Sequence, residues 1–258
     1  MMWKWLQGRR IRMRAGGLAR QEYRRLLHEW WHRKRAFFVV FGVVVLCVYV
    51  VLVVVSRDHL WTFFGGVLAG GLIAMFIAVL NSPPAWIENY QIGAWGESRT
   101  ARALVPLLND GWTVIHDISR WKSNLDHVLV GPAGVFVLDT KNYSGAVTVE
   151  RGGLTLAYGS GARPRVLGDS LGRQARAQGA ALHDVLRRRG VERPWAAAII
   201  VFWAEFPQQI AGGDRVTYVH GDALVSYLRS RPQTFTPDRV ARIADALRSG
   251  QRRAMKAR

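Results

Sequence analysis

Hydrophobic residues are distributed in two different ways along the chain. Ala36–Val55 and Trp61–Leu80 are apolar runs of twenty residues each, and neither contains a charged side chain. A helix rises about 1.5 Å per residue, so each run is long enough to cross a hydrocarbon core of about 30 Å. Only Ser56–Leu60 joins them. The pattern therefore predicts two transmembrane helices connected as a tight hairpin.

Beyond Leu80 the pattern becomes that of a folded α/β domain. Asn81–Pro84 interrupts the helix, and the following segments alternate between helical spacing and short strand-like runs. The order of three or more strands, a helix, a strand and further helices predicts a mixed sheet flanked by helices. Helices are expected over Gly93–Leu108 (ended or kinked at Pro106), Leu171–Arg189 and Leu224–Arg229, and a last helix is expected to start at Pro237 with Thr236 as its cap. Strands are expected over Trp112–His116, Leu125–Val130, Val135–Asn142, Ala146–Val149, Ala196–Trp203 and Val216–Val219.

These boundaries give a four-part organisation. We expect a basic N-terminal segment at residues 1–35, the two membrane helices at 36–55 and 61–80, a linker at 81–89 and the α/β domain at 90–258. A cleaved signal peptide is a poorer interpretation, because the first apolar run is too long, begins too late and lacks a small-residue cleavage site.

Charge sets the expected topology and partners. The formal net charge is +18, and Met1–Arg35 carries eleven Lys and Arg against two Glu. Basic residues flank membrane helices on the cytoplasmic side, so both termini are predicted to be cytoplasmic in a two-pass protein of the cell membrane. The N-terminal segment should attract anionic lipid headgroups, and the basic domain should attract nucleic acid. Glycines in the second apolar run would permit an oligomer without requiring one.

Cysteine and motif content exclude several classes of protein. The only cysteine, Cys47, lies in the first apolar run, so an intramolecular disulfide and a cysteine-rich zinc site are impossible. The chain has neither a G-x-S-x-G motif nor a P-loop, which removes support for a serine hydrolase or a P-loop ATPase.

The candidate chemistry lies in the predicted hairpin Asn124–Gly145. If Val130 pairs with Val135 across the turn, the antiparallel register places Asp126 opposite Asp139 on one face of the sheet. Strand alternation then places Lys141, two residues beyond Asp139, on the same face.

Two opposed carboxylates repel each other, and a divalent cation would offset that repulsion. Asp126 and Asp139 are hard oxygen ligands that suit Mg²⁺ or Mn²⁺, and Lys141 could orient an attacking water or stabilise charge on phosphorus. The structural alternative is that both aspartates are merely solvated and that Lys141 forms an ordinary ion pair.

Longer motifs resemble the nuclease-related domain (NERD) family, within the PD-(D/E)xK or restriction-endonuclease-like class. They are G-x-x-G-E at Gly93–Glu97, N-L-D-H-V-L-V-G-P-x-G-V-F-V-L-D-T-K-N at Asn124–Asn142, and the helix that carries Gln174. The resemblance covers roughly residues 90–205. It implies a restriction-endonuclease-like α/β fold. The proline of the class name has no counterpart before Asp126.

By this resemblance, Asp126 and Asp139 would be metal ligands and Lys141 the catalytic lysine. Glu97 would be the acidic residue of the first helix, and Gln174 the glutamine of the helix after the motif, with Gln178 as the alternative.

Other polar residues are candidates for binding roles. Lys122 (beside Trp121), Arg173 and Arg176 could contact nucleic acid or be ordinary surface residues. His127 should point away from Asp126 and pack under the sheet, and His116 is an unlikely metal ligand.

The leading hypothesis is a membrane-anchored, Mg²⁺-dependent nuclease that hydrolyses phosphodiester bonds of DNA or RNA. The alternatives are an inactive membrane-tethered module that binds nucleic acid or protein, and a domain that only positions the helical hairpin.

Overall fold

The structure is a computed structural model of the 258-residue chain. It describes residues 17–55, 59–80, 82–119, 124–150, 153–159, 163–191, 195–213 and 216–256. Ala19–Gln91 forms one compact unit, and Ile92–Arg258 belongs to a second. The two units are described separately.

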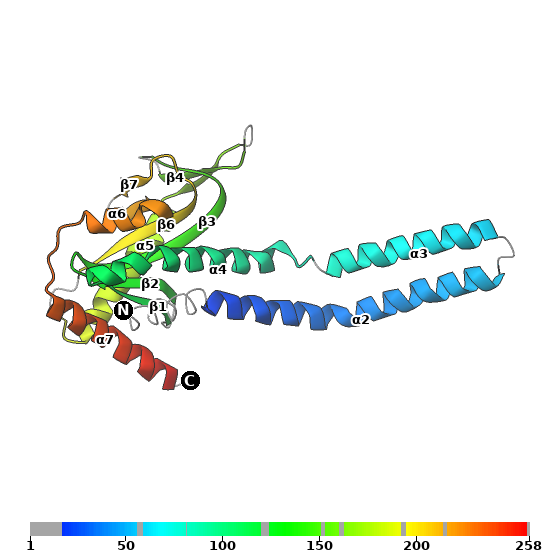
Figure 1. Ribbon diagram of the computed structural model, residues 1–258, viewed down its shortest axis with the longest axis horizontal. Coiled ribbons are helices and arrows are strands. Elements are labelled where there is room, and N and C mark those ends of the chain that lie inside the picture. The colour runs from blue at the N-terminus through cyan, green and yellow to red at the C-terminus, as the bar shows by residue number, and fades with distance from the viewer. Residues whose placement is uncertain are drawn as a thin grey trace. The chain divides into compact units, whose positions relative to one another are not determined.

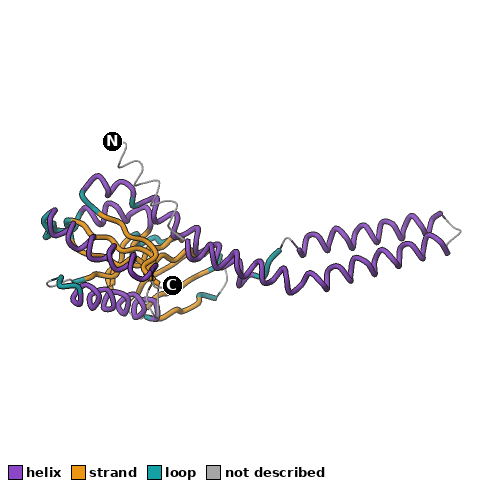
Figure 2. The backbone as a smooth tube through the Cα atoms, turned by 90° about the horizontal axis from the view of Figure 1, so that it is seen from below, coloured by secondary structure: helices purple, strands orange, loops and turns teal. Residues whose placement is uncertain are grey.

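The first unit contains two long apolar helices, α2 (Gly17–Val55) and α3 (His59–Leu80), which run side by side (Figure 2). Both are long and apolar enough to cross a membrane, as length and composition predicted. The helix of the first span begins well before Ala36, because the polar residues ahead of the apolar run are also helical.

Glycine and aromatic side chains make the contact between α2 and α3. A Cβ at Gly65 or Gly66 would lie 3.5 Å from Leu52 or from the Tyr49 hydroxyl, an ordinary van der Waals contact, so the two helices are close at these positions. Phe76 stacks on Phe41 with ring centroids 5.3 Å apart. The other two glycines of α3, Gly70 and Gly71, have no described atom within 4 Å of an added Cβ.

The second unit is built on a mixed sheet, which confirms the predicted fold class (Figure 1). Within the described residues the sheet has eight strands in the order β1-β2-β3-β6-β8-β7, and β4 and β5 extend it beside β3. The β1-β2-β3 meander is antiparallel, whereas β6 is parallel to both β3 and β8. The strands are β1 (Thr113–Ser119), β2 (Asn124–Gly131), β3 (Gly134–Glu150), β4 (Gly153–Ala157), β5 (Arg165–Gly168), β6 (Ala196–Glu205), β7 (Ile210–Gly213) and β8 (Val216–His220).

Helices cover both faces of this sheet. On one face, α4 (Ala85–Ala103), η1 (Val105–Asp110) and α6 (Leu224–Arg229) pack against Leu129, Phe136 and Leu138. On the other, α5 (Ser170–Arg188) and α7 (Pro237–Lys256) pack against the alternate residues of the same strands, such as Val128, Val135 and Val137. A short 3-10 turn, η2 (Gly221–Ala223), precedes α6.

Several predicted boundaries move for identifiable reasons. β3 is one 17-residue strand rather than two, because its pairing with β6 shifts at an irregularity between Asn142 and Ala146 without ending the strand. Helix α4 begins at Ala85, since the Pro84 carbonyl accepts the amide hydrogens of Ile87 and Glu88. It ends at Ala103, and Pro106 follows in η1, as expected of a helix breaker.

Candidate active site

The hairpin of β2 and β3 has the predicted register. Val130 pairs with Val135, and the pairing continues to His127 opposite Leu138. Beyond that pair, β2 remains bonded to β1, whereas Asp139 is paired with Ile200 of β6. We call the point where β2 and β3 stop pairing the fork. Asp126 and Asp139 are the first residues on its two arms.

Asp139 and Lys141 form a largely buried ion pair in the fork. Lys141 Nζ lies 2.9 Å from Asp139 Oδ1, and the Asp139 side chain is only 4% exposed. Burial lowers the pKa of Lys141, but the carboxylates of Asp139 and Asp126 outweigh it, so its pKa is raised. Lys141 is therefore a fixed positive charge at neutral pH.

Asp126 faces the same charge from the other arm. Its Oδ2 accepts the main-chain N–H of Thr140 at 3.4 Å, and its carboxylate helps to raise the pKa of Lys141. Asp126 is half-buried, so it remains in reach of solvent. The fork thus brings together two carboxylates and one ammonium, as the hairpin pattern predicted.

Two buried side-chain oxygen atoms, one in the fork and one on α5, lack donors within the described residues. Among the described residues, neither Asp139 Oδ2 nor Gln178 Oε1 has a hydrogen-bond partner. A buried acceptor without a partner costs about 1–3 kcal/mol, so such atoms are usually satisfied by a cation, a ligand or water. An unpartnered carboxylate oxygen beside a second aspartate is a donor set that fits a hard divalent cation.

The glutamine candidates on α5 lie on different sides of that helix. Gln174 is exposed, whereas Gln178 is buried with Ala175 and Leu182 on the side that packs against β3 and β6. The position of Gln178, the alternative considered from the sequence, is therefore the one directed toward the sheet.

Glu97 lies on α4, the helix on the opposite face of the sheet. Its main-chain carbonyl accepts from the Nε2 of His127 at 3.2 Å. Within the described part of the chain, no three His, Cys, Asp or Glu side chains form a group that could hold a metal ion. Glu97 is therefore not drawn into one cluster with Asp126 and Asp139, and its role stays a prediction.

His127 is packed under the sheet, as its alternation with Asp126 predicted. It is fully buried beneath α4, and its Nδ1 lies 2.9 Å from Nδ1 of His116. Burial lowers the pKa of His127 to about 4, although the Asp126 and Glu97 carbonyls, which would accept from both N–H groups of the charged ring, oppose that shift. The imidazole is therefore neutral at pH 7, and its single N–H can donate to only one of these carbonyls at a time.

The alternate residues of the same motif hold α4 in place, a role that the sequence analysis missed. Thr140 Oγ1 lies 3.0 Å from Thr100 Oγ1, and Asn142 Nδ2 donates to the Ile92 carbonyl at 3.1 Å. A Cβ on Gly96 would approach the Cβ of Asn142 to 2.9 Å. The available signal was the period of two, which places Thr140 and Asn142 on the face opposite Asp139 and Lys141.

The predicted nucleic-acid contacts are in part already paired. Arg176 forms an ion pair with Asp169, the residue just before α5, and Arg173 lies 4.0 Å from the same carboxylate. Lys122 and Trp121 lie outside the described residues.

One comparison with known proteins gave a match. Residues 92–203 match the family model of the nuclease-related domain (NERD), which confirms the resemblance seen in the motifs. Neither the curated proteins nor the solved structures gave a match. The matched segment contains the C-terminal part of α4, the hairpin with its fork, α5 and most of β6.

Proposed function

Because residues 92–203 carry a nuclease-related domain, we propose that this protein is a membrane-anchored, metal-dependent nuclease that hydrolyses phosphodiester bonds in DNA or RNA. The observation that carries the proposal is the fork. Its two arms bring Asp126, Asp139 and Lys141 together at a point where one buried carboxylate oxygen has no donor within the described residues.

Asp126 and Asp139 would hold the metal ion. Carboxylate oxygens are preferred ligands of Mg²⁺ and Mn²⁺, and Mg²⁺ commonly takes only one or two protein carboxylates, leaving positions for water and phosphate oxygens. Bound there, the cation would supply Lewis-acid stabilisation of the negative charge that develops on the phosphate. Two carboxylates are thus sufficient, and a third acidic residue is not required.

Lys141 would act as a donor and a positive charge rather than as a base. Asp139 Oδ1 holds its ammonium group within the fork at 2.9 Å, and the remaining N–H bonds can orient a water molecule or a phosphate oxygen. Asp139 would therefore have two tasks, one for each oxygen. Oδ1 positions Lys141, and Oδ2 is available to the cation.

Composition supports the substrate class and the membrane anchor. The chain has a formal net charge of +18, and charge of this sign favours binding to polyanions such as nucleic acids. Helices α2 and α3 would anchor the protein as a two-pass hairpin with both termini in the cytoplasm, since the N-terminal flank is rich in Arg. The same flank would bind anionic lipid headgroups.

Cleavage by the full chain in detergent micelles tests the proposal. Labelled single- and double-stranded DNA and RNA are incubated with Mg²⁺, Mn²⁺ or EDTA. We expect metal-dependent cutting that falls at least about a hundredfold in Asp139→Asn. The control, Asp110→Asn, removes an exposed carboxylate that pairs with Arg229, and it should cut normally.

Folding is measured on the same samples. Asp139→Asn leaves Lys141 without its partner, so the double variant Asp139→Asn/Lys141→Met, which removes both charges, is compared by thermal unfolding. Full activity in a folded double variant would refute the assignment of these residues. No cutting by the wild type, with salt-sensitive binding retained, would favour the membrane-tethered binding module.

A further inference from the structure

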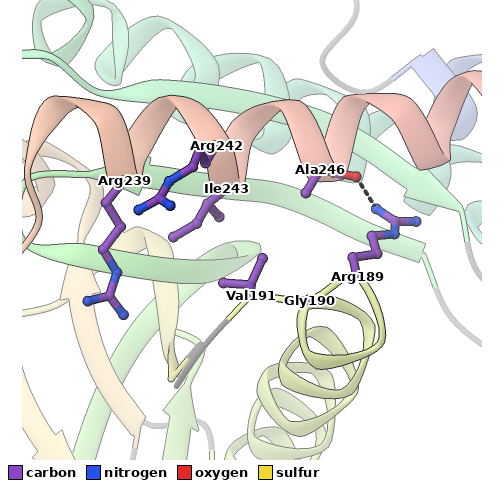
Figure 3. A pocket seen from close by; sticks show the side chains of 7 residues that line it. All are labelled: Arg189, Gly190, Val191, Arg239, Arg242, Ile243 and Ala246. Atoms are coloured by element: carbon purple, nitrogen blue, oxygen red, sulfur yellow. Dashed lines mark hydrogen bonds between the residues drawn. The ribbon is translucent and has the colours of Figure 1, made fainter.

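A groove lies between the end of α5 and α7, away from the fork. It has a volume of about 710 Å³ (Figure 3). Three of its lining residues are arginines, one from the turn after α5 and two from α7. The lining consists of Arg189, Gly190, Val191, Arg239, Arg242, Ile243 and Ala246.

Two of the arginines are held by contacts to the protein. Arg189 donates to the Ala246 carbonyl at 2.6 Å, the bond drawn in Figure 3. The guanidinium of Arg239 lies over the Phe235 ring, 4.2 Å from its centroid. Each guanidinium is planar and rigid, so these contacts fix the orientation of the whole charged group. Both groups are therefore pre-oriented at little further entropic cost.

The lining is suited to an anion. It contains no acidic residue, and its apolar members contribute little exposed surface, since Ile243 is buried and Val191 is half-buried. The nearby Asp245 of α7 is directed to Arg248, with 3.8 Å between the charged atoms. Arginine is the side chain best matched to the paired oxygens of a phosphate.

The groove and the fork share one face of the sheet. Ile243 packs in the same core cluster as Val135, at the start of β3. Asp139, four residues further along that strand, lies on the same side of the sheet as Val135. One nucleic-acid strand running along this face could therefore contact both the groove and the fork.

We propose that this groove binds the phosphate backbone of the nucleic-acid substrate at a point away from the bond that is cut. The inference rests on the proposed nuclease function and names a second contact for the same substrate. A polyanion is favoured over a lipid because one continuous strand can supply phosphates to the groove and to the fork together. A headgroup supplies a single phosphate, and its acyl chains would find little exposed apolar lining.

Salt-dependent binding tests the proposal on the full chain in a neutral detergent. Fluorescence anisotropy of a labelled 30-base-pair DNA, and of the corresponding single strand, is measured in EDTA between 50 and 300 mM KCl, so that binding is followed without cutting. In Arg239→Gln/Arg242→Gln we expect weaker binding, and a slope of log K against log salt that is shallower by about 2.

A charge-matched control comes from the opposite face. Arg102 and Arg231 are both exposed, and Arg231 lies over the Tyr227 ring much as Arg239 lies over Phe235. The variant Arg102→Gln/Arg231→Gln loses the same charge and should keep a slope close to that of the wild type. An equal loss in both double variants, or no loss in either, would overturn the proposal.

Two further arms separate the remaining explanations. In the first, dihexanoyl phosphatidylglycerol is added as a soluble probe of headgroup binding. If Arg239→Gln/Arg242→Gln lost affinity for this lipid and not for DNA or RNA, the groove would be a lipid site and the proposal would be wrong. Asp139→Asn is measured in the same binding assay. An Arg-dependent slope that persists in this variant supports the groove even if the protein does not cut, so the two proposals fail separately.

Discussion

Asp139 is a single carboxylate whose two oxygens lie in different environments. Oδ1 is 2.9 Å from the Lys141 ammonium, and Oδ2 is buried without a donor among the described residues. A carboxylate buried for structural reasons alone would be expected to have both oxygens satisfied, because each unmet acceptor costs free energy. The free Oδ2 is the atom that the proposed metal ion would engage.

Gly96 is a residue of α4 that lies close to Thr140 and Asn142 of β3. A Cβ there would approach Asn142 Cβ to 2.9 Å and Thr140 Cγ2 to 3.3 Å, whereas a Cβ on Gly93 would have no described neighbour within 4 Å. We predict that Gly96→Ala destabilises the domain by about 1–3 kcal/mol through overpacking. Gly93→Ala should be neutral or stabilise the helix by up to about 1 kcal/mol.

Thermal unfolding of the full chain in detergent, followed by near-ultraviolet circular dichroism, measures both changes. The two variants add the same methyl group to the same helix, so propensity cancels in the comparison. Equal melting temperatures for Gly96→Ala and Gly93→Ala would contradict the close contact.

His127 makes stability depend on pH. Its pKa is about 4 when folded, against an ordinary value of about 6.5, so the unfolded chain binds the proton more tightly. The folded state should therefore lose stability as pH falls from about 6.5 to about 4, by roughly 3 kcal/mol in total. His127→Asn should show a flatter profile.

Unfolding in EDTA at several pH values between 7.5 and 4.5 checks this expectation without bound metal. His183→Gln, which alters a half-buried histidine of α5, serves as the comparison and should keep the wild-type pH dependence. A wild type equally stable across the range would show that His127 is not buried in its neutral form.

At the scale of elements, β3 serves two helices at once. Its residues alternate between the faces, so Asp139 and Lys141 lie with the residues that pack under α5, while Thr140 and Asn142 hold α4. Successive residues of β3 from Asp139 to Asn142 therefore contact different partners. A shift of one residue in register would exchange the two faces.

The two glutamines of α5 give a matched test of which side of that helix serves the site. Gln178 is buried with an unpartnered Oε1, and Gln174 is exposed. We predict that Gln178→Leu lowers kcat for DNA or RNA cleavage at least about tenfold, which corresponds to about 1.4 kcal/mol of barrier. Gln174→Leu should change cleavage little.

Stability separates a catalytic contribution from a packing effect in these variants. Replacing a buried, unpartnered amide with Leu should leave the melting temperature unchanged or raise it. Reduced activity without a reduced melting temperature supports a direct role for Gln178. Activity lost only in Gln174→Leu would restore the assignment made from the sequence.

At the scale of the whole molecule, the chain combines an apolar helical hairpin with a basic α/β unit. Helices α2 and α3 expose large hydrophobic side chains along most of their length, which is unfavourable in water and favourable in lipid. A nuclease attached in this way would meet only nucleic acid that comes near the membrane surface. In the proposed topology, the basic N-terminal flank would place that surface on the cytoplasmic side.

Single-cysteine labelling tests the predicted topology. Cys47 is the only cysteine, so Cys47→Ala gives a cysteine-free background into which Arg57→Cys or Ser249→Cys is introduced. In intact spheroplasts, a membrane-impermeant maleimide should label position 57 in the hairpin link and should label position 249 only after permeabilisation. Labelling of position 249 in intact cells would reverse the orientation.

The sequence by itself determined the apolar helices, the sheet class and the hairpin register. These features follow from local periodicity, since an uncharged run of twenty residues and strict alternation around a short turn each favour one arrangement. It also placed Asp126, Asp139 and Lys141 on one face. It did not predict the short strands β4, β5 and β7, whose four or five residues carry little periodic signal.

Tertiary structure alone decided which groups surround the fork. Whether Gln174 or Gln178 faces the sheet depends on how α5 rotates about its axis, and the position of Glu97 depends on the face that α4 covers. The same holds for the groove between α5 and α7, because Arg189 lies at least fifty residues before Arg239 and Arg242 in the chain. These positions are set by how distant segments of the chain pack together, and local periodicity carries no information about that packing.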